Sequence, residues 1–480
     1  MDWNLIDEES LSNIAKTIRD FNGTEETYKP NEMPEAIFSL NKNIKNGEIK
    51  SYYSTGESIS PDTFVEFINN NKINKYKATN YELGANSYLN VSTAKISDSD
   101  FFVTYRYYVS GDSSSGLYGM VCHLNSYLDS DKTRGITYGE SVFLSNHAEN
   151  SSLVALSENK ALLIYEKKNE SKMYGRILTI NNSNISLGDE VNLNISHGYG
   201  GNAIKVANNS VLFAYRRDAS SDKISLVMLT ISGDSIFVGG LVTGTDSIES
   251  IPKIKMALIS TDKTLIVYGY MDGTDVKLKG FIAITYSAQM YSSPSLTTPV
   301  ELVGGYAGLE YDITRLSDNK ILVVYRDSDD DSPVYLNAAI ATINGTTITL
   351  GTGTRITASE SKDSFPCVGL IKEGKVLLVS SGGGAYLSGG ACAIDSSGNI
   401  TSGDYVQIES NRGNSGYNFI IPFENDEVVV VHGIPSLSTW GCSWCYIGDK
   451  AVSISSTKID GILETSASGS TAGNVWVLQD

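Results

Sequence analysis

The chain has 480 residues, of which 41% are hydrophobic, and its 55 acidic and 37 basic side chains give a formal net charge of −18. This composition is typical of a globular protein. The negative charge argues against general binding to nucleic acid and to acidic membrane surfaces, because both are anionic. No apolar run is long enough to span a bilayer, and Met1–Glu9 has neither the basic start nor the apolar stretch of a secretory signal.

Residues 1–45 predict two short helices that form an attachment segment. Apolar residues recur at helical spacing until Asn22-Gly23 supplies a stop, and a second helix is predicted after Pro30. About 40 residues cannot bury enough apolar surface to fold alone. We therefore expect this segment to dock on another chain, with packing against the protein's own body as the alternative. The residues expected to make the contact are Leu11, Ile14, Ile18, Met33, Pro34 and Ile37.

Residues 46–86 are interpreted as a connecting module with one short helix. That helix is predicted over Ser60–Ile68, where a serine cap and Pro61 at the first helical position precede an apolar stripe. The asparagine- and lysine-rich stretch Asn69–Lys77 is interpreted as a solvated linker.

Residues 87–480 carry a sevenfold repeat and a C-terminal closing segment. Short apolar runs recur with a period of 50 to 60 residues, which is typical of β-propeller blades with four strands each. We therefore predict a mainly β chain: a seven-bladed β-propeller with a small α-helical N-terminal segment. The runs are Phe101–Tyr105, Ala161–Tyr165, Val211–Tyr215, Thr264–Tyr268, Ile321–Tyr325, Val376–Ser380 and Val428–His432.

Each apolar run is predicted to be the second strand of its blade, buried on both faces because it shows no alternation. In the last unit, Lys458–Leu463 is predicted to be the fourth strand, so that no strand is borrowed from the N-terminal side. Short polar turns join strands one to two and three to four, and they lie on one rim of the ring. The longer connections share the opposite rim, where we expect the functional surface.

Aromatic side chains in the longer connections are the candidate ligand contacts. A flat ring with a hydroxyl suits stacking on sugar faces, and 28 tyrosines is a high number. The candidates are Tyr107, Tyr108, Tyr199, Tyr270, Tyr306, Tyr311 and Tyr417. An arginine follows the strand-ending tyrosine at Tyr105-Arg106, Tyr215-Arg216 and Tyr325-Arg326. This repetition predicts a structural bond to neighbouring loops, with ligand contact as the alternative.

Catalytic and metal-binding patterns are weak in this sequence. The Ser-x-Asp-x-Gly-x-x-Trp repeat of sialidases is missing, and the four histidines are scattered over different units. Cys442-Ser-Trp-Cys445 lies in a predicted strand, where positions three apart point to opposite faces, so both are interpreted as structural thiols. The acidic loop Asp327–Ser332 is interpreted as solvated rather than as a calcium site. We expect no catalytic residue, no metal and no cofactor.

Two segments near the ends of the chain resemble tail proteins of phages that infect Gram-positive bacteria. Leu11–Arg19 and Tyr28–Ile37 look like the "IA-x-x-IR" helix and the "P-x-E-M-P-x-x-I" turn common in baseplate-attached proteins. Ile459–Val477 resembles the "I-x-G-I-A-x-T-x-G-x-x-G-x-x-V-x-V" ending of such tail fibres. Leu463-Glu464 stands where a small residue is commoner, so the closing strand is expected to depart from the pattern.

This resemblance implies a phage tail fibre or receptor-binding protein, or its counterpart in a phage-tail-like bacteriocin, anchored to the baseplate and assembled in the bacterial cytoplasm. We expect the propeller to bind a host cell-wall glycan without catalysis, and several copies, as in a trimer, to add avidity. Two alternatives stay open. The propeller is a depolymerase that cleaves the glycan, or the chain is a purely structural baseplate component.

Overall fold

The chain divides into two compact units, one of residues 1–70 with 448–480 and one of residues 71–447. The helices predicted for residues 1–45 lie outside the described residues. Within the described ranges, no helix is long and apolar enough to cross a membrane. The computed structural model describes residues 49–54, 64–68, 73–75, 91–107, 116–125, 136–181, 183–196, 198–217, 223–247, 253–272, 275–285, 292–304, 310–327, 335–357, 364–382, 386–403, 405–409, 418–424, 427–434, 439–447, 451–454, 461–463 and 473–477.

The first unit contains a closed five-stranded sheet in the order β1-β36-β2-β37-β38. Its strands are β1 Ile49–Ser54, β2 Phe64–Ile68, β36 Ala451–Ile454, β37 Gly461–Leu463 and β38 Gly473–Val477. The helix predicted over Ser60–Ile68 is therefore wrong, because its second half is strand β2. The sequence Phe-Val-Glu-Phe-Ile fits a helical stripe, but its aromatic and β-branched residues also favour a strand, and pairing with β36 and β37 decides the outcome.

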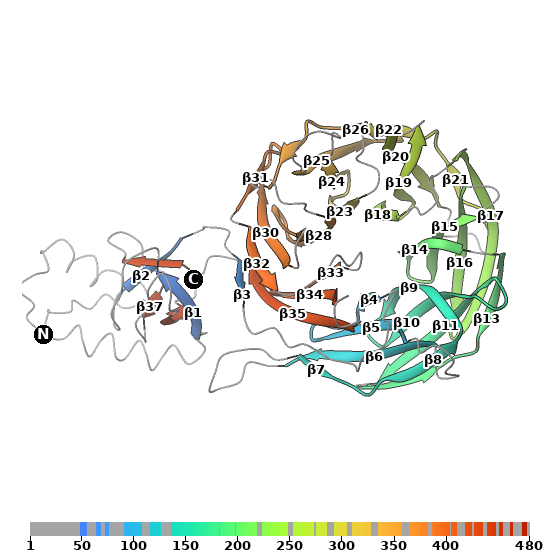
Figure 1. The fold of residues 1–480 in the computed structure, drawn as a ribbon, viewed down its shortest axis with the longest axis horizontal. Helices are drawn as coiled ribbons and strands as arrows, with labels where there is room; N and C mark the ends of the chain where they lie inside the picture. The colour runs from blue at the N-terminus through green and yellow to red at the C-terminus, as the bar shows by residue number, and fades with distance from the viewer. Residues whose placement is uncertain are drawn as a thin grey trace, which may run out of the picture. The chain divides into compact units, whose positions relative to one another are not determined.

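The second unit is a seven-bladed β-propeller, as predicted, and Figure 1 shows its sheets arranged in a ring. In five blades the outer strand is split into two short segments that pair with the same third strand. Blade 1 contains β4 Ser92–Lys95, β5 Asp100–Tyr107, β6 Gly116–Leu124, β7 Ile136–Tyr138 and β8 Val142–Asn146; blade 2 contains β9 Ala148–Ser157, β10 Lys160–Lys167, β11 Lys172–Asn181, β12 Asn184–Leu187 and β13 Val191–Ser196; and blade 3 contains β14 Gly198–Ala207, β15 Ser210–Arg217, β16 Lys223–Ser232 and β17 Ser235–Ser247. Blade 4 contains β18 Ile254–Ser260, β19 Lys263–Asp272, β20 Asp275–Ile284, β21 Ser295–Leu296 and β22 Val300–Val303; and blade 5 contains β23 Tyr311–Ser317, β24 Lys320–Asp327, β25 Tyr335–Asn344, β26 Thr347–Leu350 and β27 Thr354–Arg355. Blade 6 contains β28 Ser364–Lys372, β29 Lys375–Gly382, β30 Tyr386–Ile394, β31 Ile400–Ser402 and β32 Val406–Glu409; and blade 7 contains β33 Asn418–Pro422, β34 Glu427–Ile434, β35 Thr439–Ile447 and β3 Ile73–Lys75.

The core is divided among the interfaces between blades. The seven apolar runs lie in β5, β10, β15, β19, β24, β29 and β34, and their side chains are buried on both faces. Each pair of neighbouring blades shares a hydrophobic cluster, including the pair formed by blade 7 and blade 1. The inner strands also contact one another in sequence, and β33 contacts β4, so the ring is closed.

Blade 7 is completed by a strand from the N-terminal side of the propeller. Strand β3 pairs antiparallel with β35, as Figure 1 shows with β3 in blue beside the red strands. The prediction that Lys458–Leu463 supplies this strand is wrong, since β37 belongs to the first unit. The interpretation of Asn69–Lys77 as a linker is also wrong in part. An outer strand is held by backbone hydrogen bonds, so β3 needs no apolar pattern that a sequence would reveal.

Connections of uneven length occur on both rims. We call the rim with the second-to-third and inter-blade connections the loop rim, and the opposite one the turn rim. On the turn rim, most hairpins are short, but residues 125–135 of blade 1 and 285–294 of blade 4 are long. On the loop rim, β19 and β20 are joined by two residues only. The predicted asymmetry therefore holds in part, and loop length alone does not locate the functional surface.

Candidate functional site

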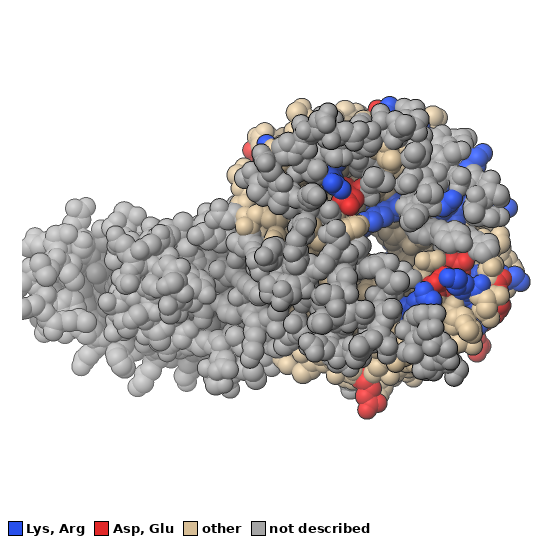
Figure 2. Space-filling view, viewed as in Figure 1, with Lys and Arg blue, Asp and Glu red and all other residues tan. Residues whose placement is uncertain are grey.

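Six side chains meet on the loop rim beside three consecutive inner strands, and we call them the mouth cluster. Lys253 directly precedes β18, and Lys255 lies within that strand; Glu310 and Asp312 stand in the same way at β23. Figure 2 shows basic and acidic side chains gathered beside the opening at the centre of the ring. The members of the mouth cluster are Lys253, Lys255, Glu310, Asp312, Arg326 and Phe365.

Asp312 links the inner strands of blades 4, 5 and 6. Its Oδ1 lies 2.8 Å from the Lys255 Nζ, and its Oδ2 accepts a hydrogen bond of 2.9 Å from the N–H of Val368. The Asp312 side chain is 8% exposed. The neighbouring Cys367 is buried, and this burial raises the pKa of its thiol well above the usual value, so it is a packing residue and not a nucleophile.

Glu310 joins the end of a second strand to the start of the next blade. Its Oε2 accepts a hydrogen bond of 3.0 Å from the N–H of Phe365 and lies 3.5 Å from Nη1 of Arg326. The structural role predicted for the arginines that follow strand-ending tyrosines is confirmed here. It is confirmed again at Arg106, whose Nη1 lies 2.7 Å from Oε2 of Glu149 at the start of blade 2.

Phe365 has a backbone conformation that a bulky side chain rarely adopts, with φ at +53°. It begins a bulge in β28, in which Phe365 and Pro366 stand opposite Ser380. Bulges at the same register occur at Asn150 in β9 and at Gly200 in β14. Asparagine and glycine tolerate positive φ, whereas phenylalanine does so only at a cost of about 1–2 kcal/mol.

Polar groups from both neighbouring blades hold Phe365 in this conformation. Its N–H donates to Glu310 of blade 5, and its carbonyl accepts a hydrogen bond of 3.1 Å from Nδ2 of Asn418 of blade 7. Strained residues persist where the surroundings fix them in this way, and they concentrate at functional sites. The ring is half-buried, and the Nζ of Lys253 lies 4.5 Å from its centroid.

The pKa of Lys253, the lysine next to the Phe365 ring, is lowered. Burial, followed by the positive charge of Lys255, lowers the pKa of Lys253 to about 8. The charges of Glu310 and Asp312 act in the opposite direction without restoring the usual value. A group with a shifted pKa at the central opening of a propeller is a candidate for ligand contact. No sequence pattern predicted this role for Lys253.

Of the seven predicted tyrosines, the three whose side chains the structure describes are not members of the mouth cluster. Tyr107 is partly buried and packs edge-on against Tyr118. Tyr270 lies on the loop rim, where its hydroxyl donates to Glu301 at 2.9 Å. Tyr311 is a buried core residue, and its hydroxyl accepts a hydrogen bond from the N–H of Gly269. Tyr199 lies in β14, where its backbone pairs with Arg216 of β15, but its side chain is outside the described part of the structure. Tyr108, Tyr306 and Tyr417 are also outside it.

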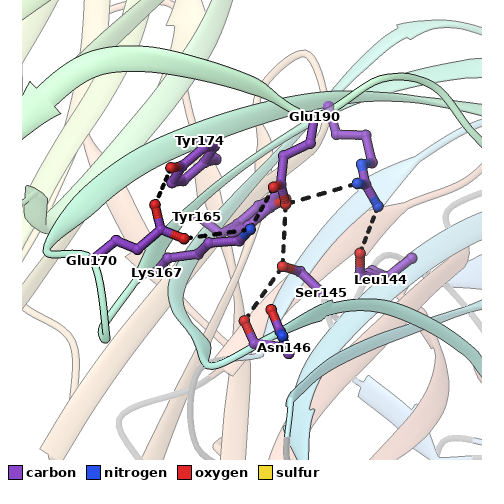
Figure 3. A network of polar contacts seen from close by, with 9 residues as sticks. Leu144, Ser145, Asn146, Tyr165, Lys167, Glu170, Tyr174 and Glu190 are labelled. Carbon is purple, nitrogen blue, oxygen red and sulfur yellow. Dashed lines mark hydrogen bonds and ion pairs between the residues drawn. The ribbon is translucent and has the colours of Figure 1, made fainter.

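A second polar network surrounds Glu190 and joins blade 1 to blade 2 (Figure 3). The carboxylate accepts hydrogen bonds from Tyr165 and Lys167 and one of 3.3 Å from the Ser145 hydroxyl. Nη2 of Arg176 lies 3.7 Å from Oε1 of Glu190, and Nη1 of Arg176 donates a hydrogen bond of 2.7 Å to the carbonyl of Leu144. Because every member is engaged with another and the network joins β8 of blade 1 to β10 and β11 of blade 2, we interpret it as a clamp between blades.

Replacing Glu190 by glutamine tests this clamp. Burial by itself raises the pKa of Glu190, but the bonds from Lys167 and Tyr165 and nearby positive charges outweigh it, so the pKa lies below its usual 4.5. A lowered pKa stabilises the fold above pH 4.5, and this contribution is lost as the pH falls through the lowered value. We expect Glu190→Gln to reduce the free energy of unfolding at neutral pH by about 1–2 kcal/mol. Urea unfolding should show the difference shrinking in acid; a constant difference would contradict the assignment.

A hollow of about 500 Å³ lies between blades 3 and 4. Tyr268 and Phe281 line it together with Pro294 and Pro299, and its described lining carries no charged side chain. It therefore offers apolar contact and few groups to orient a ligand, which makes it a weaker candidate than the mouth cluster.

The five cysteines are buried, and two of the described histidines have polar partners. Cys442 and Cys445 pack into the clusters on opposite faces of blade 7, which confirms the prediction from their spacing. His432 is buried against the Ser443 hydroxyl at 3.1 Å, and His123 pairs with Asp100. Among the described residues, no group of three or more His, Cys, Asp or Glu is placed to hold a metal ion. The acidic loop Asp327–Ser332 lies largely outside the described residues.

No family model and no curated protein matches the chain. Solved structures with a similar fold include a protein from Lactobacillus plantarum, with 11% identity, a TM-score of 0.46 and coverage of 73% of this chain and 98% of that one. An α-L-arabinofuranosidase from Fusarium graminearum has 11% identity, a TM-score of 0.41 and coverage of 63% and 93%. A sialidase from Streptococcus pneumoniae has 9% identity, a TM-score of 0.40 and coverage of 69% and 70%. At these identities the likeness is one of fold.

The expectation that the chain is not an enzyme is corrected by these comparisons. Two of the three structures are named for enzyme activities, so a propeller of this kind does not by itself indicate a binding-only protein. The expectation came from the missing sialidase repeat and the scattered histidines. A propeller site is assembled from connections of different blades, so the absence of one local motif does not exclude catalysis.

Proposed function

We propose that the chain is a receptor-binding component of a phage tail or phage-tail-like particle, and that its propeller recognises a host cell-surface carbohydrate at the mouth cluster. The mouth cluster is the observation that carries the carbohydrate part. It brings cationic donors, carboxylate acceptors and an aromatic side chain together at the central opening of the propeller. Such groups suit a sugar, whose hydroxyls pair with charged side chains and whose apolar face packs on aromatic rings.

The tail assignment rests on the two terminal resemblances, in residues 11–37 and 459–477. In this proposal the N-terminal segment binds the baseplate or another tail protein, assembly takes place in the bacterial cytoplasm, and several copies on one particle raise the avidity for the host surface.

Cleavage of the bound carbohydrate is a second candidate function, and the same cluster favours it. A strained residue, two carboxylates and a lysine of lowered pKa are features that concentrate at catalytic sites. Incubation with cell walls, followed by an assay of reducing ends, separates the two functions. Release that Glu310→Gln abolishes would favour cleavage, and binding without release would favour recognition.

Replacing Phe365 tests the mouth cluster as the binding site. Both Phe365→Gly and Phe365→Ala remove the ring, and we expect each to weaken binding of the full chain to cell walls at least about tenfold. Glycine also relieves the positive φ, so the glycine variant should be more stable than the alanine variant by about 1 kcal/mol. Sedimentation with cell walls and thermal unfolding measure the two effects.

The matched control is Phe143→Ala, which removes a 44%-exposed aromatic ring from the outer strand β8. It should bind like the unchanged chain. Unchanged binding by both Phe365 variants would exclude the mouth cluster as the site, and equal stability of these two variants would contradict the strain.

A further inference from the structure

Among the described residues, Lys253 differs from the other cations of the mouth cluster because no carboxylate lies within ion-pair distance of its ammonium. Lys255 pairs with Asp312 at 2.8 Å, and Arg326 lies 3.5 Å from Glu310. Within the described part of the chain, the contact recorded for the Lys253 ammonium is the ring of Phe365, 4.5 Å from its centroid. The two carboxylates of the cluster are therefore already engaged, and three cations face two anions.

This excess positive charge stands out in a chain whose net charge is −18. Figure 2 shows both basic and acidic side chains beside the central opening, and acidic residues outnumber basic ones in the whole chain. Keeping a partly desolvated ammonium next to a second lysine is unfavourable, and this is why its pKa is lowered. An anion bound at this position would remove the repulsion and supply the missing counter-charge.

The ring of Phe365 fixes where that anion would bind. The strained backbone holds the ring against Lys253, and an ammonium over an aromatic face keeps its other donors directed away from the ring. The surrounding groups that carry or gain charge are Lys255 on the same strand, Glu310 and Asp312 at β23, Arg326 on β24 and Cys367 on β28. None of the carboxylates is within ion-pair distance of Lys253 among the recorded contacts of the described residues.

We propose that Lys253 selects carbohydrates that carry an acidic substituent, a carboxylate or a phosphate, and that this anion binds beside the Phe365 ring. This inference rests on the proposed carbohydrate-binding function and deepens it. Phe365 contacts the sugar in the proposed function and also positions Lys253, which makes the direct contact with the anion.

The test compares the full chain with Lys253→Met, Lys253→Arg and the control Lys372→Met, which removes an exposed lysine on the turn rim. The probes are a galacturonate oligomer, its methyl ester, in which the charge is masked, and a glycerol-phosphate oligomer. Calorimetry should show that the unchanged chain prefers an anionic probe to the ester. Lys253→Met should lose about 10- to 100-fold in affinity for that probe, as expected for a charge-assisted hydrogen bond. Lys372→Met should lose none.

The pH dependence separates a direct contact from a structural effect. Anion binding needs the protonated lysine, so the affinity should be full below pH 8 and fall as the pH rises above that value. Lys253→Arg stays charged, so its binding should persist at high pH. Binding of the galacturonate oligomer would identify the anion as a carboxylate, and binding of the glycerol-phosphate oligomer would identify it as a phosphate.

A result in which neither anionic probe binds more tightly than the uncharged ester would overturn the inference. So would an unchanged preference in Lys253→Met. Cell-wall binding that persists under any of these outcomes leaves the proposed function standing, whereas loss of cell-wall binding by the unchanged chain would defeat that function separately.

Discussion

Replacing Trp440 by alanine should lower the free energy of unfolding by about 3–5 kcal/mol, as large-to-small changes of buried aromatic residues do. Trp440 is fully buried in the cluster shared by blade 7 and blade 1. Its ring lies 5.8 Å from that of Tyr105 and 6.1 Å from that of Tyr138, both in blade 1. The cavity would therefore open at the interface that closes the ring.

Urea unfolding followed by circular dichroism measures this effect. The control is Leu241→Ala, which truncates a 44%-exposed side chain of β17 and should change the stability by no more than about 0.5 kcal/mol. Trp440→Phe should lose less than the alanine variant because it fills part of the space. A loss as small as that of the control would show that the first and last blades are not held together by this residue.

Replacing Asp312 by alanine should cost about 1.5–3 kcal/mol, because it removes one partner of a partly buried ion pair, in which the Lys255 side chain is 27% exposed. Burial lowers the pKa of Lys255, and the charge of Asp312 more than restores it, so the net shift is upward. The pair therefore contributes at neutral pH, and on the alkaline side its contribution is lost as the pH rises through the raised pKa of Lys255. The variant also leaves the N–H of Val368 without its acceptor.

A double variant, Asp312→Ala with Lys255→Met, distinguishes the ion pair from packing. Removing the second charge should recover part of the lost stability, since the penalty comes largely from the unpaired ammonium. Losses that add up without any recovery would contradict this explanation. Both measurements are made by urea unfolding at neutral pH.

The propeller was predictable because its strongest signal is local. A second strand such as Ala161–Tyr165 must be apolar on both faces, and seven such runs at one period leave few other folds. The completion of blade 7 by β3 was not predictable in this way. An outer strand contributes backbone hydrogen bonds, and Ile73-Asn74-Lys75 carries no pattern that distinguishes it from a linker.

The mouth cluster was missed because it is assembled from residues with no local signature. Lys253 and Glu310 lie in connections between blades, where a charged residue is ordinary, and they meet only when β18 and β23 stand side by side. One signal was present. Pro366 lies in β28, the first strand of blade 6, and proline within a sheet marks an edge or a bulge. Aligning the units on their second strands would have placed Phe365 at the position of Asn150 and Gly200.

The donation of β3 to the last blade also bears on how the chain acquires its structure during synthesis. Strand β3 leaves the ribosome before any blade, yet its partner β35 belongs to the last one. At about 5–20 residues per second, the wait is on the order of 20 to 70 seconds. The blades between them can form in the meantime, and the unpaired edge of β35 is covered only at the end, so ring closure is a late event in biogenesis.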